Sequence, residues 1–165
     1  MRSADVDFDR IFPDYTCPGK LEPFFIKGDW SVHQIAGPLL ERIGPADVSI
    51  ATFNVSDEAL RVFVDSGNIR SLRMLLDIGV RLHKFALLLF AAEITPHIRL
   101  DSCHSKLFLV SGDGYDFGIC GSANLNTGNR YESGFWFTAG PCFDFFLEQF
   151  NQAYENAIAY DTDID

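Results

Sequence analysis

The sequence predicts a single α/β domain built on a mixed, mostly parallel β-sheet with helices on both faces. In the first half of the chain, segments with helical periodicity alternate with short apolar segments, a pattern typical of a sheet covered by helices. The 165 residues are 47% hydrophobic and 22% charged, so the chain can bury one sizeable core and is not disordered. We expect the domain to span residues 29–160, between an irregular arm (1–28) and a frayed acidic tail (161–165).

The individual elements follow from periodicity and from capping and breaking residues. Residues 30–43 carry apolar side chains at helical spacing and stop at Gly44-Pro45, which predicts a helix. The arm is rich in proline and glycine, and within it only residues 24–27 are expected to form a strand. The same criteria predict strands at 47–55, 72–80, 97–100, 106–110, 116–120 and 132–138, and helices at 56–65, 81–93 and 143–160.

Charge narrows the classes of function. The chain has 13 Lys and Arg against 23 Asp and Glu, a net charge of −10, which argues against a protein that coats DNA or anionic membranes. The charge is uneven, because residues 61–106 carry seven basic and four acidic side chains, a net +3, and the rest carry six and 19, a net −13. A focused phosphate site is therefore compatible with an acidic whole.

The composition gives no support to a disulfide scaffold, a zinc site or a membrane span. The start of the chain is polar and acidic, unlike a secretory signal, and the longest apolar run (85–92) is about half of a membrane span. We therefore expect a reduced, cytoplasmic protein. The four cysteines are scattered and form no CxxC pair: Cys17, Cys103, Cys120 and Cys142.

Two short motifs carry the chemistry. Residues 104–106 are His-Ser-Lys, and residues 121–124 are Gly-Ser-Ala-Asn at the end of the next predicted strand. If residues 104–110 form a strand, His104 and Lys106 share one face, and pairing of the two strands brings Ser122 and Asn124 beside them. Lys106 and Asn124 could hold phosphate oxygens, and His104 could attack phosphorus or shuttle a proton. This set suits a phosphodiester and requires neither a metal nor a cofactor.

At these residues the chain resembles the phospholipase D superfamily. Its hallmark is HxK, an Asp after four further residues, and GSxN; here HxK lies at 104–106 and GSxN at 121–124. The strand at 48–55 also resembles the first strand of that fold, and the order of elements fits over roughly residues 30–160. The resemblance implies a metal-independent phosphodiesterase, similar to bacterial nucleases that carry a single motif.

The resemblance also implies roles for individual residues. His104 would be the nucleophile that forms a phosphohistidine, Lys106 and Asn124 would bind phosphate, and Ser122 would support the site. A His from a second motif would protonate the leaving oxygen, and Glu132 would orient it. Because this chain has one HxK, a complete site implies a homodimer with one motif from each subunit. Apolar area for that interface would come from a Phe-rich half: Phe135, Phe137, Phe143, Phe145, Phe146 and Phe150.

One position departs from the family pattern. Ser111 stands where the family has the Asp of HxK, and the segment 111–116 is longer than the usual turn. Asp113 or Asp116 could supply the missing carboxylate from this hairpin. In the family that Asp is a supporting group, so the change bears on rate and stability more than on reaction type.

Three functions therefore remain open. A phosphodiesterase of the nuclease type is favoured. The second is a hydrolase or transferase of the same fold that acts on a phospholipid or a small phosphodiester. The third is a catalytically weak scaffold for protein binding, which Ser111 and the acidic composition support.

Overall fold

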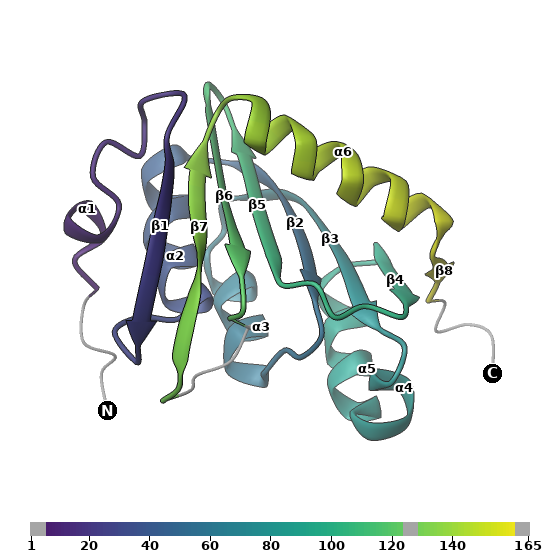
Figure 1. The fold of residues 1–165 in the computed structure, drawn as a ribbon. Helices are drawn as coiled ribbons and strands as arrows, with labels where there is room; N and C mark the ends of the chain where they lie inside the picture. The colour runs from purple at the N-terminus through teal and green to yellow at the C-terminus, as the bar shows by residue number, and fades with distance from the viewer. Residues whose placement is uncertain (1–5, 124–128, 161–165) are drawn as a thin grey trace.

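The computed structural model describes residues 6–123 and 129–160, which fold into one α/β domain with an eight-stranded sheet (Figure 1). The predicted acidic tail and Asn124 lie outside the described residues. The elements, in chain order, are α1 (Phe8–Ile11), β1 (Leu21–Lys27), α2 (Val32–Ile43), β2 (Ala46–Thr52), α3 (Asp57–Asp65), β3 (Ile69–Asp77), α4 (Val80–His83), α5 (Phe85–Ile94), β4 (Ile98–Asp101), β5 (Leu107–Gly112), β6 (Tyr115–Gly121), β7 (Tyr131–Thr138), α6 (Pro141–Asn156) and β8 (Ile158–Ala159).

The sheet is mixed, as expected, but mostly antiparallel, so the prediction of a mostly parallel sheet is wrong. Its order is β1-β7-β6-β5-β2-β3-β4-β8, and only the β2–β3 and β3–β4 pairs are parallel. Parallel neighbours require a crossover, and here the crossovers are α3 and the α4–α5 segment. The other pairs are antiparallel: β5, β6 and β7 pair with one another in chain order, β5 also pairs with β2, β7 with β1, and β8, which follows α6, with β4.

Helices cover both faces of the sheet, as predicted. On one face α1, α2, α3 and α5 contribute to a large core together with residues from β2 to β6. On the other face α6 lies across the sheet (Figure 1), and its Phe143 and Phe150 pack with Leu109 and Phe137 in a second, smaller core. The sheet therefore forms the middle of three layers.

The predicted helices and strands between residues 30 and 138 are present, with ends displaced by at most three residues. Ser31 precedes α2, and its backbone N–H donates to the Gln34 side chain at 2.9 Å. Ser56 caps α3 by accepting from the Ala59 N–H at 3.2 Å. The predicted helix 81–93 is broken at Lys84 into α4 and α5, and the predicted C-terminal helix stops at Asn156, after which β8 pairs with β4.

The N-terminal segment is more ordered than the sequence predicted. β1 is seven residues long and pairs with β7 along its whole length. Phe12, which follows α1, has no exposed surface and makes edge contacts with the rings of Trp30, Phe117 and Trp136. Aromatic packing against distant residues orders this segment, and no local periodicity announces such packing.

His33, in the first turn of α2, is a buried titratable group. Its side chain is 2% exposed, with Ser31 Oγ 3.3 Å from Nδ1 and a Glu58 carboxylate oxygen 3.9 Å from Nε2. Burial lowers the pKa of His33, and Glu58 opposes that effect only in part. The folded state therefore resists a proton that the unfolded chain takes up below its ordinary pKa of about 6.5.

We expect the free energy of unfolding to fall between pH 7.5 and pH 5.5, with the contribution of His33 fully present above about pH 6.5. Urea denaturation at several pH values measures this fall. In His33→Gln the fall should be smaller, whereas His97→Gln, a change at an exposed histidine, should leave it unchanged. An equal fall in the free energy of unfolding in wild type and His33→Gln would show that His33 is not its source.

Candidate active site

The HxK residues lie in the loop that enters β5, and not within the strand as predicted, because β5 begins at Leu107. Two backbone contacts fix this loop. The Cys103 N–H donates to Asp77 Oδ1 at 2.9 Å, at the end of β3, and the Lys106 carbonyl accepts from the Gly121 N–H at 3.2 Å. The loop thus sits at the carboxyl ends of the parallel strands β2 and β3, the usual place for ligands on an open α/β sheet.

His104 and Lys106 project side by side despite the irregular backbone. Lys106 Nζ lies 3.0 Å from His104 Nδ1 and donates to the His104 carbonyl oxygen at 2.8 Å. An ammonium can only donate, so in this contact the imidazole nitrogen accepts, which requires a lone pair on the ring. His104 itself is exposed at the edge of the sheet.

Phe53, which directly follows β2, forms a wall of this site. Its ring centroid lies 5.0 Å from that of His104 and 5.8 Å from Lys106 Nζ, and the side chain is 47% exposed. No motif or periodicity in the sequence singles out Phe53. Its position at the carboxyl end of a strand with a parallel neighbour is the signal that could have found it.

Ser122 and Glu132, both predicted for the site, are joined by a short hydrogen bond in which the Ser122 hydroxyl donates to the carboxylate. Ser122 also accepts from the Ser133 N–H at 3.0 Å, so the hydroxyl is held between β6 and β7. The serine therefore fixes one oxygen of Glu132 and leaves the other able to accept a further hydrogen bond.

The close approach of β6 and β7 explains why the first residue of GSxN is a glycine. Gly121 is paired with Gly134 across β6 and β7, and a Cβ at Gly121 would overlap the Ser133 carbonyl oxygen. A Cβ at Gly134 would in turn lie 2.7 Å from the Gly121 Cα. This close approach of two backbones brings Ser122 within reach of Glu132.

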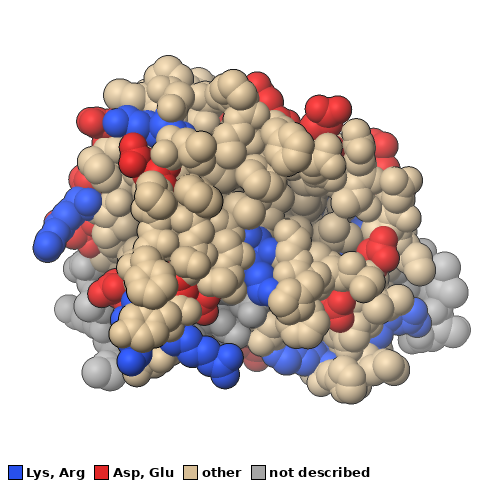
Figure 2. All heavy atoms as spheres, in the orientation of Figure 1, with Lys and Arg blue, Asp and Glu red and all other residues tan. Residues whose placement is uncertain are grey.

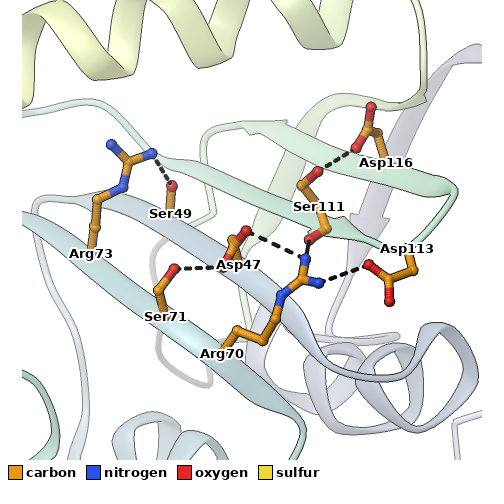
Figure 3. A network of polar contacts seen from close by, with 8 residues as sticks. All are labelled: Asp47, Ser49, Arg70, Ser71, Arg73, Ser111, Asp113 and Asp116. Carbon is orange, nitrogen blue, oxygen red and sulfur yellow. Dashed lines mark hydrogen bonds and ion pairs between the residues drawn. The ribbon is translucent and has the colours of Figure 1, made fainter.

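Apart from Ser122, the predicted supporting residues Ser111, Asp113 and Asp116 lie elsewhere, at the hairpin that follows the far end of β5 (Figure 3). Ser111 is five residues beyond Lys106, roughly 16 Å along an extended chain. Its hydroxyl donates to Asp116 Oδ1 at 2.6 Å, and Asp113 pairs with Arg70 at 2.7 Å. The structure thus places neither Asp113 nor Asp116 beside His104; both brace the hairpin between β5 and β6.

Asp47, on β2, lies beside this hairpin and joins the same network. It is paired with Ser111 in the sheet, accepts from Ser71 Oγ at 2.8 Å, and lies 3.4 Å from Arg70 Nη2. The hydrogen bond to Asp113 raises the pKa of Arg70, and Asp47 adds to that effect. The network therefore ties the hairpin to β2 and β3 through one guanidinium.

The cysteines near the site are poor candidates for chemistry. Burial raises the pKa of the Cys103 and Cys120 thiols, which keeps them protonated. Within residues 6–123 and 129–160, no three His, Cys, Asp or Glu side chains cluster as metal ligands would.

Basic side chains between residues 61 and 106 are dispersed over the molecule. Arg73 lies over the Phe150 ring and donates to Asn151, and Arg99 lies over the Tyr154 ring, so both brace α6. Lys84, which donates to the Asn54 side chain, lines the pocket beside the candidate site together with Phe53. Figure 2 agrees, since Lys and Arg appear on the drawn face as separate groups and uncharged residues predominate.

Solved structures with this arrangement of helices and strands include a phospholipase D family member, Nuc from Salmonella typhimurium. It superposes with a TM-score of 0.60 at 14% identity, over 86% of this chain and all of that one. NucT from Helicobacter pylori gives 0.57 at 13% identity, again over 86% of this chain and all of that one. The chain has the phospholipase D fold. The resemblance drawn from HxK and GSxN is thereby confirmed at the level of the fold.

By sequence, no family model and no curated protein matches the chain. In the described part of the phospholipase D fold, none of the helices combines the length and the apolar character needed to cross a membrane.

Ser111 offers a test of the hairpin network, because Ser111→Asp restores the family residue. The new carboxylate would lie between its cross-strand neighbours Asp47 and Asp116, so we expect a loss of about 1–2 kcal/mol in stability. The deficit should shrink toward about pH 4, where aspartates take up protons.

Thermal denaturation of Ser111→Asp and of Ser111→Asn, which matches it in size without the charge, measures this cost. A Ser111→Asp protein at least as stable as wild type at pH 7 would show that the network tolerates the family carboxylate.

Proposed function

We propose that this protein is a metal-independent phosphodiesterase that cleaves nucleic acid through a phosphohistidine, at a site shared by two copies of the chain. The observation that carries the proposal is the contact of His104 with Lys106, in a loop whose Lys106 carbonyl accepts from the Gly121 N–H next to Ser122, on a phospholipase D fold. In the proposed site a nucleophile, a fixed cation and the carboxylate held by Ser122 act on one phosphate.

In the first step a lone pair of the His104 imidazole attacks phosphorus, and the bond from phosphorus to the leaving oxygen breaks. Lys106, whose ammonium already faces the ring at 3.0 Å, binds a non-bridging oxygen and stabilises the charge that develops there. The leaving oxygen takes a proton from the partner subunit's His104, which acts as an imidazolium and becomes neutral. In the second step that histidine removes a proton from water, and the water oxygen replaces His104 on phosphorus.

Glu132 has a place in this scheme. Its carboxylate is held by Ser122, so its free oxygen can accept from the imidazole N–H of a histidine and fix the orientation of the ring. Asn124, which the resemblance assigns to phosphate binding, stays a prediction, as do the roles of Ser122 and Glu132.

Replacement of the nucleophile tests the reaction. We expect His104→Ala to lower cleavage of a labelled single-stranded oligonucleotide by at least about a thousandfold, because no other group can form the intermediate. The wild type should keep its rate in EDTA, and His97→Ala, at an exposed histidine away from the motif, should behave as wild type. A wild type inactive on oligonucleotides, phospholipids and model diesters alike would point instead to the scaffold function.

The shared site makes a separate prediction. Light scattering should give twice the 18.5 kDa mass of one chain, and co-refolding with an equal amount of His104→Ala should reduce activity per wild-type chain to about half, because mixed dimers hold one histidine. The same amount of His97→Ala should leave that activity unchanged. A fully active monomer would rule out the shared site.

A further inference from the structure

A pocket of about 240 Å³ opens beside the HxK loop. Phe53 forms one wall, and the apolar side chains of Val55, Leu76 and Val80 lie on its lining. Lys84, at the break between α4 and α5, is an exposed part of the same lining. None of these residues belongs to the HxK or GSxN motifs, and the proposed reaction does not use them.

We propose that this pocket binds the nucleobase next to the scissile phosphate, with Phe53 as the stacking surface and Lys84 as a contact for the neighbouring phosphate. This inference rests on the proposed function and adds to it a subsite for an unpaired base. Because a base enters such a pocket only when it is unpaired, the pocket favours single-stranded over double-stranded substrate.

Position is the first argument. Phe53 belongs both to the pocket and to the candidate active site, since its ring lies 5.0 Å from the His104 ring and 5.8 Å from Lys106 Nζ. A group bound against the pocket side of Phe53 is therefore an immediate neighbour of a phosphate bound by His104 and Lys106. In a nucleic acid, that neighbour is a nucleoside.

Size and shape are the second argument. The volume is below the roughly 300–1,000 Å³ of sites that enclose a drug-sized ligand, so the pocket suits one ring system and not a pair of acyl chains. A flat aromatic wall over an apolar floor is also what stacking of a base requires. The polar edges of a base would meet Asn54 and His83, which line the pocket as well.

Charge is the third argument. The lining contains one carboxylate, Asp77, whose oxygens accept from the backbone N–H groups of Cys103 at 2.9 Å and Gly79 at 3.0 Å. Both oxygens of Asp77 therefore already accept hydrogen bonds within the protein, and these hold the loop in place. Lys84 supplies an ammonium at the same place, in a chain whose net charge is −10. A cation set at an apolar pocket is complementary to a base joined to a phosphate.

The test compares two single-stranded oligonucleotides with the same backbone, one with its bases and one with abasic residues throughout. We expect the wild type to cleave the strand with bases at least about tenfold more efficiently in kcat/KM, which is the size of one base–aromatic stack. Val80→Phe should fill the pocket without touching His104, and so lower cleavage of the strand with bases to that of the abasic strand. Val64→Phe, the same change at an exposed position of α3, should leave the ratio unchanged.

Two further variants keep the test decisive if Val80→Phe fails to fold. Phe53→Leu retains apolar bulk but removes the flat ring, so the preference for bases should disappear. Lys84→Gln should raise KM for both strands and leave kcat unchanged.

The outcomes separate the two proposals. Equal cleavage of both strands by the wild type, or an equal loss on both strands in Val80→Phe, would overturn the base pocket and leave the phosphodiesterase standing. Absence of cleavage of either strand by the wild type would overturn the proposed cleavage of nucleic acid itself.

Discussion

The candidate site depends on the register of β5 against β6. Leu107 is paired with Cys120, and the next hydrogen bond toward the site joins the Lys106 carbonyl to the Gly121 N–H. Side chains alternate between the faces of a strand, so a slip of one residue would break the hydrogen bond between Lys106 and Gly121 and change which face of β6 lies beside the HxK loop. At the other end of the hairpin, the hydrogen bond from Ser111 to Asp116 holds the same register. Contacts at both ends of β5 therefore hold the same strand register. Ser111, at the position where the family has an aspartate, contributes to it through a cross-strand hydrogen bond.

How far the sequence predicts this structure depends on whether a feature is local. The helix that starts after Ser31 and the helix capped by Ser56 were predicted because their signals lie within a few residues of their ends. The predicted direction of the strands was wrong, because strand direction depends on which distant strand becomes a neighbour in the sheet. Only the segments before β3 and β4 contain crossover helices, and β5, β6 and β7 pair antiparallel with one another in chain order.

In the candidate site, too, local features could be predicted from the sequence and contacts between distant residues could not. The two motifs lie on consecutive predicted strands, which usually pair, and the structure pairs β5 with β6 so that the Lys106 carbonyl meets the Gly121 N–H. Spacing could not show that Phe53, about fifty positions earlier in the chain, would lie against His104, because that contact arises from the pairing of β2 with β5. The burial of Phe12 against Trp136 was not predicted for the same reason.

Charge and site geometry together indicate how a substrate would be held. Arg70, Arg73 and Arg99 contact the hairpin network and α6, whereas Lys84 and Lys106 lie at the candidate site. A site with few cations releases few counterions from a nucleic acid, and a net charge of −10 adds repulsion, so electrostatic attraction alone would bind a strand weakly. Affinity must then come from contacts that do not depend on charge. An apolar pocket beside the catalytic loop offers such contacts, and a second copy of the chain would double their number at the shared site.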